Sequence, residues 1–312
     1  MITLEKYRKQ LSEFYEYLLD KFFKKELLIP DQLTLSAIGV RICYSTAPDF
    51  AELLGDPRIS KETEKFAFLK RLYEAKHDSV FAHSPILFAE KDRFQKFNVF
   101  KLWQFYKSSI THFCASARHL VEAMRYRNLD FDVLATSVKK QTPFSLKYTS
   151  EREGNREIIV IRLPKTKPWW WTSVIAFGVS RVMTHQFVRH TWLNFSQRSH
   201  RYTPVDGYAF PETITRKPFL KGISEEVIEF FKELKEKVPG DVKKEDLRYL
   251  YPHGVQTTIM ASGPHFVWEH FISVRKHPKA QLEIRKFAEI VEKKLFTSQS
   301  GEEMMEFCPD SS

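Results

Sequence analysis

The stretch HQFVRHTWLNFSQRSHRY, residues 185–202, gathers three arginines and three histidines within eighteen positions. Serine, threonine and glutamine side chains are interleaved with them. Such a density of positive charge and hydrogen-bond donors indicates either an exposed basic surface or a site that holds an anion. The spacing alone leaves both interpretations open.

The local pattern around this stretch predicts a helix followed by a loop. Ser180 is a good N-cap for a helix that runs through His190. Within such a helix, Gln186 and Arg189 lie one turn apart on one face, with His185 beside Arg189. The next segment, NFSQRSHRYTP, is rich in turn-forming residues and predicts a loop.

This arrangement would suit a phosphate group. A loop carrying Ser196, Ser199 and Arg201 would fold over the helix end that carries Arg189. Guanidinium groups bind phosphate oxygens in pairs, and serine hydroxyls complete the shell.

Hydrophobic periodicity predicts a single α+β domain over residues 1–312, dominated by helices around a central sheet. We expect strands at 84–89, 157–163 and 169–177, and a mostly helical segment at 91–137. The polar tail from residue 297 is expected to be frayed. The helices are expected at 3–25, 33–44, 61–76, 225–237 (capped by Ser224), a short segment through Arg248, 264–275 and 278–296.

The charge and the glycine spacing limit the kinds of ligand and binding site that this protein can have. The 49 basic and 39 acidic residues give a net charge of +10, which suits a nucleotide, a nucleic acid or a thermophile-like surface. The ten glycines form no GxG pair, so a Rossmann fingerprint and a P-loop are excluded and phosphates must be bound by side chains.

Targeting and cysteine patterns point to a cytoplasmic protein. The N-terminus carries charges throughout, and no apolar run approaches a membrane span, so we expect neither a secretory signal nor membrane insertion. Three cysteines exclude a disulfide framework. His112, Cys114 and His119 form a loose cluster, but no fourth ligand is evident and the segment resembles a helix, so we expect no metal site.

Several motifs together resemble the flavin-dependent thymidylate synthases, the ThyX family. Arg189-His190-Thr191, Ser199 and Arg201-Tyr202 are similar to that family's RHR, seven residues, serine, arginine-tyrosine signature. Further resemblances lie, in order, in RICY (41–44), HDSVFAHSPILF (77–88), VSRVMTHQFVRH (179–190), RYLYP (248–252) and SVRKHPKAQLEIRKFA (273–288).

The resemblance implies a ThyX-like fold, deoxyuridine monophosphate (dUMP) as substrate and a homotetramer with shared active sites. It assigns catalytic roles to Arg189, Ser199 and Arg275, either Arg189 or Arg275 polarising the uracil ring. The implied dUMP-binding residues are Gln186, Arg189, Gln197, Ser199, Arg201, Arg248 and Arg275.

The same resemblance implies that FAD carries the chemistry. NADPH would reduce the flavin, and methylenetetrahydrofolate would supply the one-carbon unit, so no protein nucleophile is needed. The implied FAD contacts are His77, Ser79, His190, Ser196 and His270.

Departures from the family pattern cluster on the flavin side. Thr191 stands where the family carries arginine, and Ala82 where it carries glutamate. Gly263, His265 and His270 stand at positions of flavin-contacting Asn, Arg and Asn. The nucleotide half of the site is therefore retained, whereas the flavin half is rebuilt. Each lost charged contact costs about 1.5–3 kcal/mol.

Three features remain open. The segment 90–168 exceeds the usual family length, and residues 1–30 form an N-terminal helical extension. The longer segment either lays cationic side chains against a cofactor or is a peripheral elaboration or subunit contact; the side chains concerned are Arg118, His119, Arg125, Tyr126 and Arg127. The tryptophans at 169–171 either stack on a ligand or pack in the core or a subunit interface, whereas His83, His253 and His265 are expected to be structural.

The sequence is compatible with three alternative functions. The first is reductive methylation of dUMP to thymidylate. The second is a paralogue of the same fold that binds a pyrimidine nucleotide but has another cofactor or substrate. The third is a non-catalytic nucleotide- or nucleic-acid-binding protein. The retained Gln186, Ser199 and Arg201 favour a mononucleotide pocket over a polyanion groove, so nucleic acid is the least expected partner.

Overall fold

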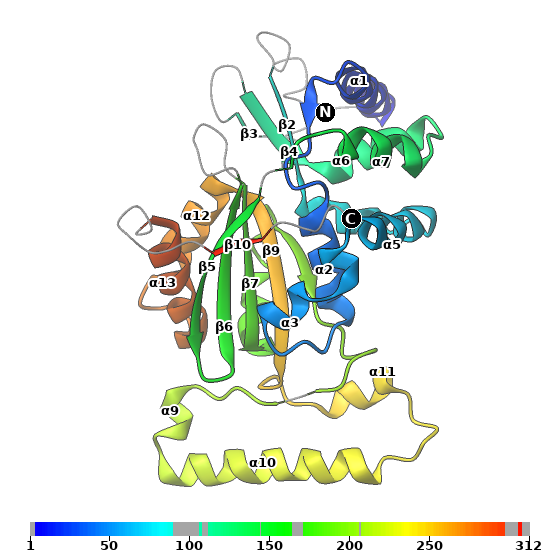
Figure 1. The fold of residues 1–312 in the computed structure, drawn as a ribbon. Helices are drawn as coiled ribbons and strands as arrows, with labels where there is room; N and C mark the ends of the chain where they lie inside the picture. Colours follow the sequence, from blue (N-terminus) through cyan, green and yellow to red (C-terminus); the bar gives the residue numbers. More distant parts are fainter. Residues whose placement is uncertain are drawn as a thin grey trace.

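A six-stranded antiparallel sheet forms the centre of the molecule (Figure 1). The computed structural model describes residues 4–89, 106–107, 112–143, 145–163, 171–205, 207–296 and 305–307. In spatial order, the strands are β10 (Met305–Phe307), β5 (Leu146–Glu153), β6 (Arg156–Leu163), β7 (Trp171–Ser180), β9 (Gln256–Pro264) and β8 (Asn194–Gln197). The expected α+β class with a central antiparallel sheet is confirmed.

The two faces of this sheet pack against different layers. Ile158 and Val160 of β6 face a cluster formed with three helices, α8 (Arg181–Phe187), α12 (His265–Arg275) and α13 (Leu282–Phe296). Ile159 and Ile161, which alternate with them, belong to the core on the other side. Successive strand residues point to opposite faces, so the run IIVI (158–161) is apolar at every position because both faces of the sheet are covered.

The opposite layer carries the N-terminal half of the chain (Figure 1). It contains a second sheet, which was not predicted, in the order β1 (Leu27–Leu28), β2 (Pro85–Ala89), β4 (His112–Ser116) and β3 (Tyr106–Lys107). The surrounding helices are α1 (Leu4–Phe23), α2 (Thr34–Tyr44), α3 (Phe50–Leu54), α4 (Pro57–Ser60), α5 (Glu62–Glu74), η1 (Asp78–His83), α6 (Ala117–Tyr126) and α7 (Phe131–Lys139).

Residues 212–250 form an arm at the lower end of the molecule in Figure 1. It consists of α9 (Glu212–Thr215), α10 (Pro218–Lys237), α11 (Lys244–Leu247) and η3 (Arg248–Leu250). The expected cap at Ser224 is wrong, because α10 begins at Pro218, and Ser224 donates its hydroxyl to the carbonyl of Lys221 inside the helix. Proline at the first position starts a helix because its ring presets φ.

Other expected elements need correction. The helix expected through His190 ends at Phe187, and residues 194–197, expected in a loop, form β8 against β9. His112 and Cys114 lie on β4 rather than on a helix. The tail was expected to fray, yet Met305–Phe307 pairs with β5. Neighbouring strands supply backbone partners that override local preference in short segments. The residues joining β6 to β7, with Trp169 and Trp170, lie outside the described residues.

Trp171 packs in the core, as one of the two alternatives predicted. Its side chain is buried, and its indole N–H donates to the carbonyl of His83 at 2.7 Å. No helix among the described residues is long and apolar enough to cross a membrane.

Candidate active site

A β-bulge and a helix cap position α8 directly after β7, an inner strand of the central sheet. Gly178 lies in the bulge at the end of β7 with φ of +67°, and a Cβ there would stand 2.3 Å from the carbonyl oxygen of Asn155. Only glycine tolerates this close approach at positive φ. Two residues later, Ser180 accepts a hydrogen bond from the amide of Met183 and donates to the carboxylate of Glu283 on α13. The cap at Ser180 is confirmed.

Arg275, at the end of α12, is the centre of a polar cluster beside α8. Its Nε donates to His190 Nε2 at 2.8 Å, and its terminal nitrogens donate to the side-chain and backbone oxygens of Gln186 at 3.3 and 2.9 Å. Gln186 in turn donates to Gln281 at 2.7 Å. A guanidinium has five N–H groups, so two remain for a ligand. The family resemblance implies that Gln186 and Arg275 bind dUMP and that His190 binds FAD, and the structure brings these three side chains into contact.

His190 is a neutral imidazole in this cluster. Burial, Arg275, His270 and Arg189 lower its pKa to about 4. Because Nε2 accepts from Arg275, the proton lies on Nδ1, which can donate to a ligand. Burial and the neighbouring Arg189 also lower the pKa of Arg275. The result is a positively charged surface that favours an anion or a polarised carbonyl oxygen.

A cavity of about 780 Å³ opens next to this cluster, between the end of α8 and α12. Its volume suits a cofactor-sized ligand. Trp192 and Phe266 form an aromatic wall, with ring centroids 5.9 Å apart. The other lining residues are Arg189, His190, Thr191, Val267, His270, Val274 and Arg275. His190 and His270, two of the predicted flavin contacts, line the same cavity as two of the predicted substrate contacts.

Gly263 explains one departure from the family pattern. A Cβ at this position would lie 2.9 Å from the side chain of Leu193 and 3.4 Å from the carbonyl of Trp192. A larger side chain at this position would require the side chain of Leu193, in the segment that supplies the aromatic wall, to shift. Ala82 is buried on η1, away from solvent.

The remaining predicted flavin contacts do not join this cavity. Ser196 is buried, and its hydroxyl bonds His83 Nε2 at 2.8 Å, while His83 Nδ1 bonds Ser262 at 2.9 Å. His77 and Ser79 are exposed, and neither lines the cavity within the described part of the chain. Burial lowers the pKa of His83 to about 3, which agrees with its expected structural role.

The other predicted substrate residues lie on β8, on the loop after it and, for Arg248, on η3. Gln197 donates to Thr184 of α8 at 3.0 Å. Ser199 is held by its amide, which donates to the carbonyl of Cys43 at 3.0 Å. Arg201 is exposed and paired with Glu245 of α11 at 2.8 Å. The first residue after α11 is Arg248. Among the described contacts, none joins Arg201 or Arg248 to Arg275.

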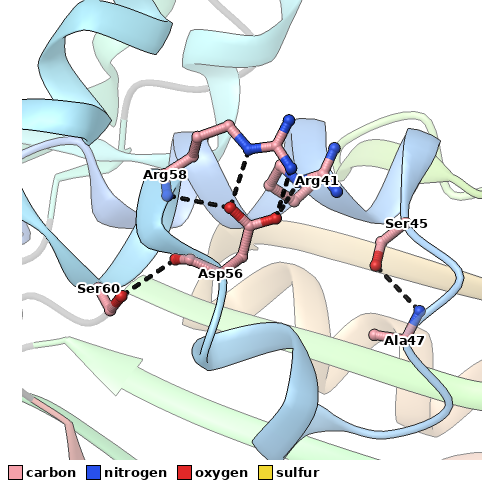
Figure 2. A network of polar contacts seen from close by, with 6 residues as sticks. All are labelled: Arg41, Ser45, Ala47, Asp56, Arg58 and Ser60. Atoms are coloured by element: carbon pink, nitrogen blue, oxygen red, sulfur yellow. Dashed lines mark hydrogen bonds and ion pairs between the residues drawn. The ribbon is translucent and has the colours of Figure 1, made fainter.

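Arg41, in the segment that resembled the family's early motif, has a structural role. Asp56 accepts hydrogen bonds from Arg41 and from Arg58 (Figure 2), at 2.7 and 2.8 Å. Burial raises the pKa of Asp56, but these two guanidinium groups outweigh it and lower the pKa to about 2. The pair fixes α2 against α4.

The cationic side chains of the long segment are already engaged. Arg125 of α6 donates to Asp78 at 2.9 Å and to the carbonyl of Tyr73 at 2.7 Å. Arg118 and Arg127 pair with Glu122 and Glu16. The hypothesis that these side chains contact a cofactor therefore stays a prediction, and such a contact would have to replace these ion pairs. Through Arg125, α6 holds η1 in place.

The sequence did not single out Trp192, Phe266 and Gln281. The two aromatic residues line the cavity, and Gln281 holds the amide of Gln186. Gln281 lies inside the AQLEIR block and was available as a signal. Trp192 and Phe266 come from separate segments, and only tertiary structure joins them.

The similarity to known proteins lies in the same part of the chain as this site. Residues 172–297 match the family model described as thymidylate synthase complementing protein. A flavin-dependent thymidylate synthase from Sulfurisphaera tokodaii is 36% identical over 121 residues, which covers 36% of this chain and 44% of that protein. One from Thermococcus onnurineus is 31% identical over 156 residues, which covers 44% of this chain and 62% of that protein.

The chain thus spans about half the length of the curated relatives that it matches. A solved ThyX structure from Helicobacter pylori, with FAD and dUMP, is similar at a TM-score of 0.35 and 18% identity, over 42% of this chain and 69% of that one.

Proposed function

We propose that this chain, whose residues 172–297 match the family model described as thymidylate synthase complementing protein, is a flavin-dependent thymidylate synthase that catalyses the reductive methylation of dUMP to thymidylate. One observation carries the proposal. Arg275 is held by His190 and Gln186 at the edge of a cavity with an aromatic wall, and it retains two N–H donors. Those are the residues at which the family pattern expects substrate and flavin to meet.

Arg275 and Arg189 supply charge in this proposal. Both guanidinium groups line the cavity, and no carboxylate lines it among the described residues. Their fields would polarise the uracil carbonyls and stabilise negative charge that develops on the ring. Ser199 and Arg201 would bind the nucleotide, with Gln197 holding their loop against α8. Arg201 would exchange Glu245 for the phosphate.

FAD fits the cavity in part. The wall of Trp192 and Phe266 suits a planar ring, and the Nδ1–H of neutral His190 suits a ring acceptor. When bound, the flavin supplies the redox chemistry, with NADPH as reductant and methylenetetrahydrofolate as one-carbon donor. His270 completes the proposed contacts, whereas Ser196 is committed to His83. His77 and Ser79 would need to contact the flavin in another subunit.

A homotetramer with shared active sites would unite the separated groups. Arg201 and Arg248 lie near α11, whereas Arg275 lies at the end of α12. The arm that carries α10 and η3 exposes large apolar side chains, as expected of a subunit contact. These are Phe219, Phe230, Tyr249 and Leu250, exposed by 78, 59, 85 and 57%.

The visible absorption spectrum of the purified protein tests the cofactor assignment. We expect a flavin band after FAD is added, and a change in that band when dUMP is added. The matched variant Trp192→Ala should weaken FAD binding, whereas Trp171→Phe, in the core, should not change its affinity. If no flavin binds even with dUMP present, the cofactor assignment is wrong, and the chain either uses another cofactor or has a binding role.

A further inference from the structure

Gln281 lies where α8, α12 and α13 come together. It directly precedes α13, and its carbonyl accepts a hydrogen bond from the amide of Arg285 at 3.0 Å, within the first turn of that helix. In the short connection from α12, the amide of Ala280 donates to the carbonyl of His277 at 2.8 Å. These backbone bonds fix the point from which the Gln281 side chain extends.

The side chain of Gln281 reaches α8. Its Oε1 accepts a hydrogen bond from Nε2 of Gln186 at 2.7 Å, and both side chains are half-buried. At the other end of α8, Glu283 accepts from the amide of Ser180 at 2.9 Å. The start of α13 is therefore joined to both ends of α8. Among the described contacts, the bond to Gln186 is the only one that the Gln281 side chain makes.

The direction of the bond between the two glutamines is imposed by Arg275. A guanidinium has donors and no acceptor, and Arg275 donates to both the side-chain and the backbone oxygen of Gln186. Oε1 of Gln186 must therefore face Arg275, so the NH₂ group of the same amide must face away from it. That group can only donate, and Gln281 supplies the acceptor that it needs.

Loss of this acceptor would release the Gln186 amide. A half-buried N–H without a partner is unfavourable, so the amide would rotate toward water. Rotation would also take Oε1 away from Arg275, which would lose one of the acceptors that fix its guanidinium. Arg275 lines the cavity, whereas Gln281 does not line it among the described residues. An effect of Gln281 on a ligand in the cavity would therefore pass through Gln186 and Arg275.

We propose that Gln281 is a positioning residue, which accepts from Gln186 and thereby holds Arg275 in the orientation that presents its free N–H groups to the substrate. A donor fixed before the ligand binds needs no reorganisation when charge develops on that ligand. The proposal rests on the proposed function in naming dUMP as the substrate. The fixed orientation of the Gln186 amide belongs to the ligand-free protein and is measured without it.

Two variants of similar size separate the acceptor from the packing of Gln281. Gln281→Leu removes the acceptor, whereas Gln281→Glu keeps it. Nuclear magnetic resonance relaxation of the Gln186 side-chain amide in the ligand-free protein is the first measurement, with the signal identified by its absence from Gln186→Leu. We expect a rigid amide in the wild type and in Gln281→Glu, and an order parameter below about 0.6 in Gln281→Leu.

Steady-state kinetics with dUMP are the second measurement. Gln281→Leu should lower kcat/KM for dUMP about tenfold, with most of the loss in kcat, because Arg275 acts on charge that develops in the transition state. Gln281→Glu should retain at least a third of the wild-type value. In a protein that already carries Gln186→Leu, Gln281→Leu should change kcat/KM less than twofold, because the interaction that it removes is already absent.

The two measurements separate this proposal from the proposed function. An equally rigid Gln186 amide in Gln281→Leu and in the wild type would overturn the positioning role, whether or not thymidylate is formed. Equal losses of kcat in Gln281→Leu and Gln281→Glu would also overturn it, because the nitrogen of Gln281 would then act directly. If the Gln186 amide responds as expected and the wild type forms no thymidylate, the positioning role stands and the proposed function is wrong.

Discussion

Arg275 is the residue whose contacts most clearly link packing to chemistry. Three of its donors are used to fix it, and these fix His190 as a neutral acceptor at Nε2. A side chain locked in this way needs no reorganisation when a ligand binds, which is the arrangement that stabilises developing charge most effectively.

Arg275→Gln should therefore abolish most of the activity. We expect kcat/KM for dUMP to fall about a hundredfold or more, equivalent to ~2.7 kcal/mol. Arg285→Gln is the control, because Arg285 lies on the next helix and its side chain donates to the carbonyl of Pro278. Steady-state kinetics of both variants measure this effect. If Arg275→Gln and Arg285→Gln had the same kcat/KM for dUMP, Arg275 would have only a structural role.

The lowered pKa of Asp56 predicts how the stability of the protein changes with pH. Its pKa is about 2 in the folded protein and 3.8 for the free side chain. A lowered carboxyl pKa stabilises the fold above the higher value, and this contribution is lost as the pH falls through the lower one. Compared with Asp56→Asn, the wild type should be more stable by about 2 kcal/mol at pH 7. Urea unfolding at pH 7, 4 and 2.5 should show that difference shrink between pH 4 and 2; a constant difference would exclude ionisation as its cause.

At the scale of elements, the bulge at Gly178 sets the direction in which the chain leaves β7 and enters α8. Gly178→Ala should destabilise the protein by roughly 2 kcal/mol or more, because the new Cβ meets the carbonyl of Asn155 at positive φ. Gly222→Ala on α10, where a Cβ has open space, should stabilise by up to about 1 kcal/mol. Thermal unfolding of the pair measures both. Equal effects would mean that the bulge does not constrain the chain.

The elements also show what a sequence can reveal. Periodicity located α1, α2, α5, β2 and β6, because each has a long or strongly patterned apolar face. It missed β5, whose run LKYTSERE is polar on its exposed positions, and β8, which depends on β9 for its backbone partners. The family resemblance, rather than periodicity, placed Arg275, Gln186 and His190 in one site. The aromatic wall of Trp192 and Phe266 became visible only from the packed structure.

On the scale of the whole molecule, the groups proposed to bind one nucleotide lie in separate parts of the chain. Arg201 is held by Glu245 on α11, while Arg275 belongs to the cluster at the end of α12. If active sites are shared between subunits, mixing two inactive variants restores intact sites at some interfaces. Arg201→Ala and Arg275→Gln, unfolded and refolded together, should regain a measurable part of the activity that each lacks alone. No recovery in mixed oligomers would place the whole site within one subunit.

The most direct test of the central claim is the formation of thymidylate itself. The purified protein, supplied with FAD, NADPH, methylenetetrahydrofolate and dUMP, should release thymidylate detectable by mass spectrometry. Release should stop when any of these components is omitted, and in Arg275→Gln. If a folded protein that binds both FAD and dUMP forms no thymidylate, the proposed reaction is wrong, and the site binds a nucleotide for another purpose.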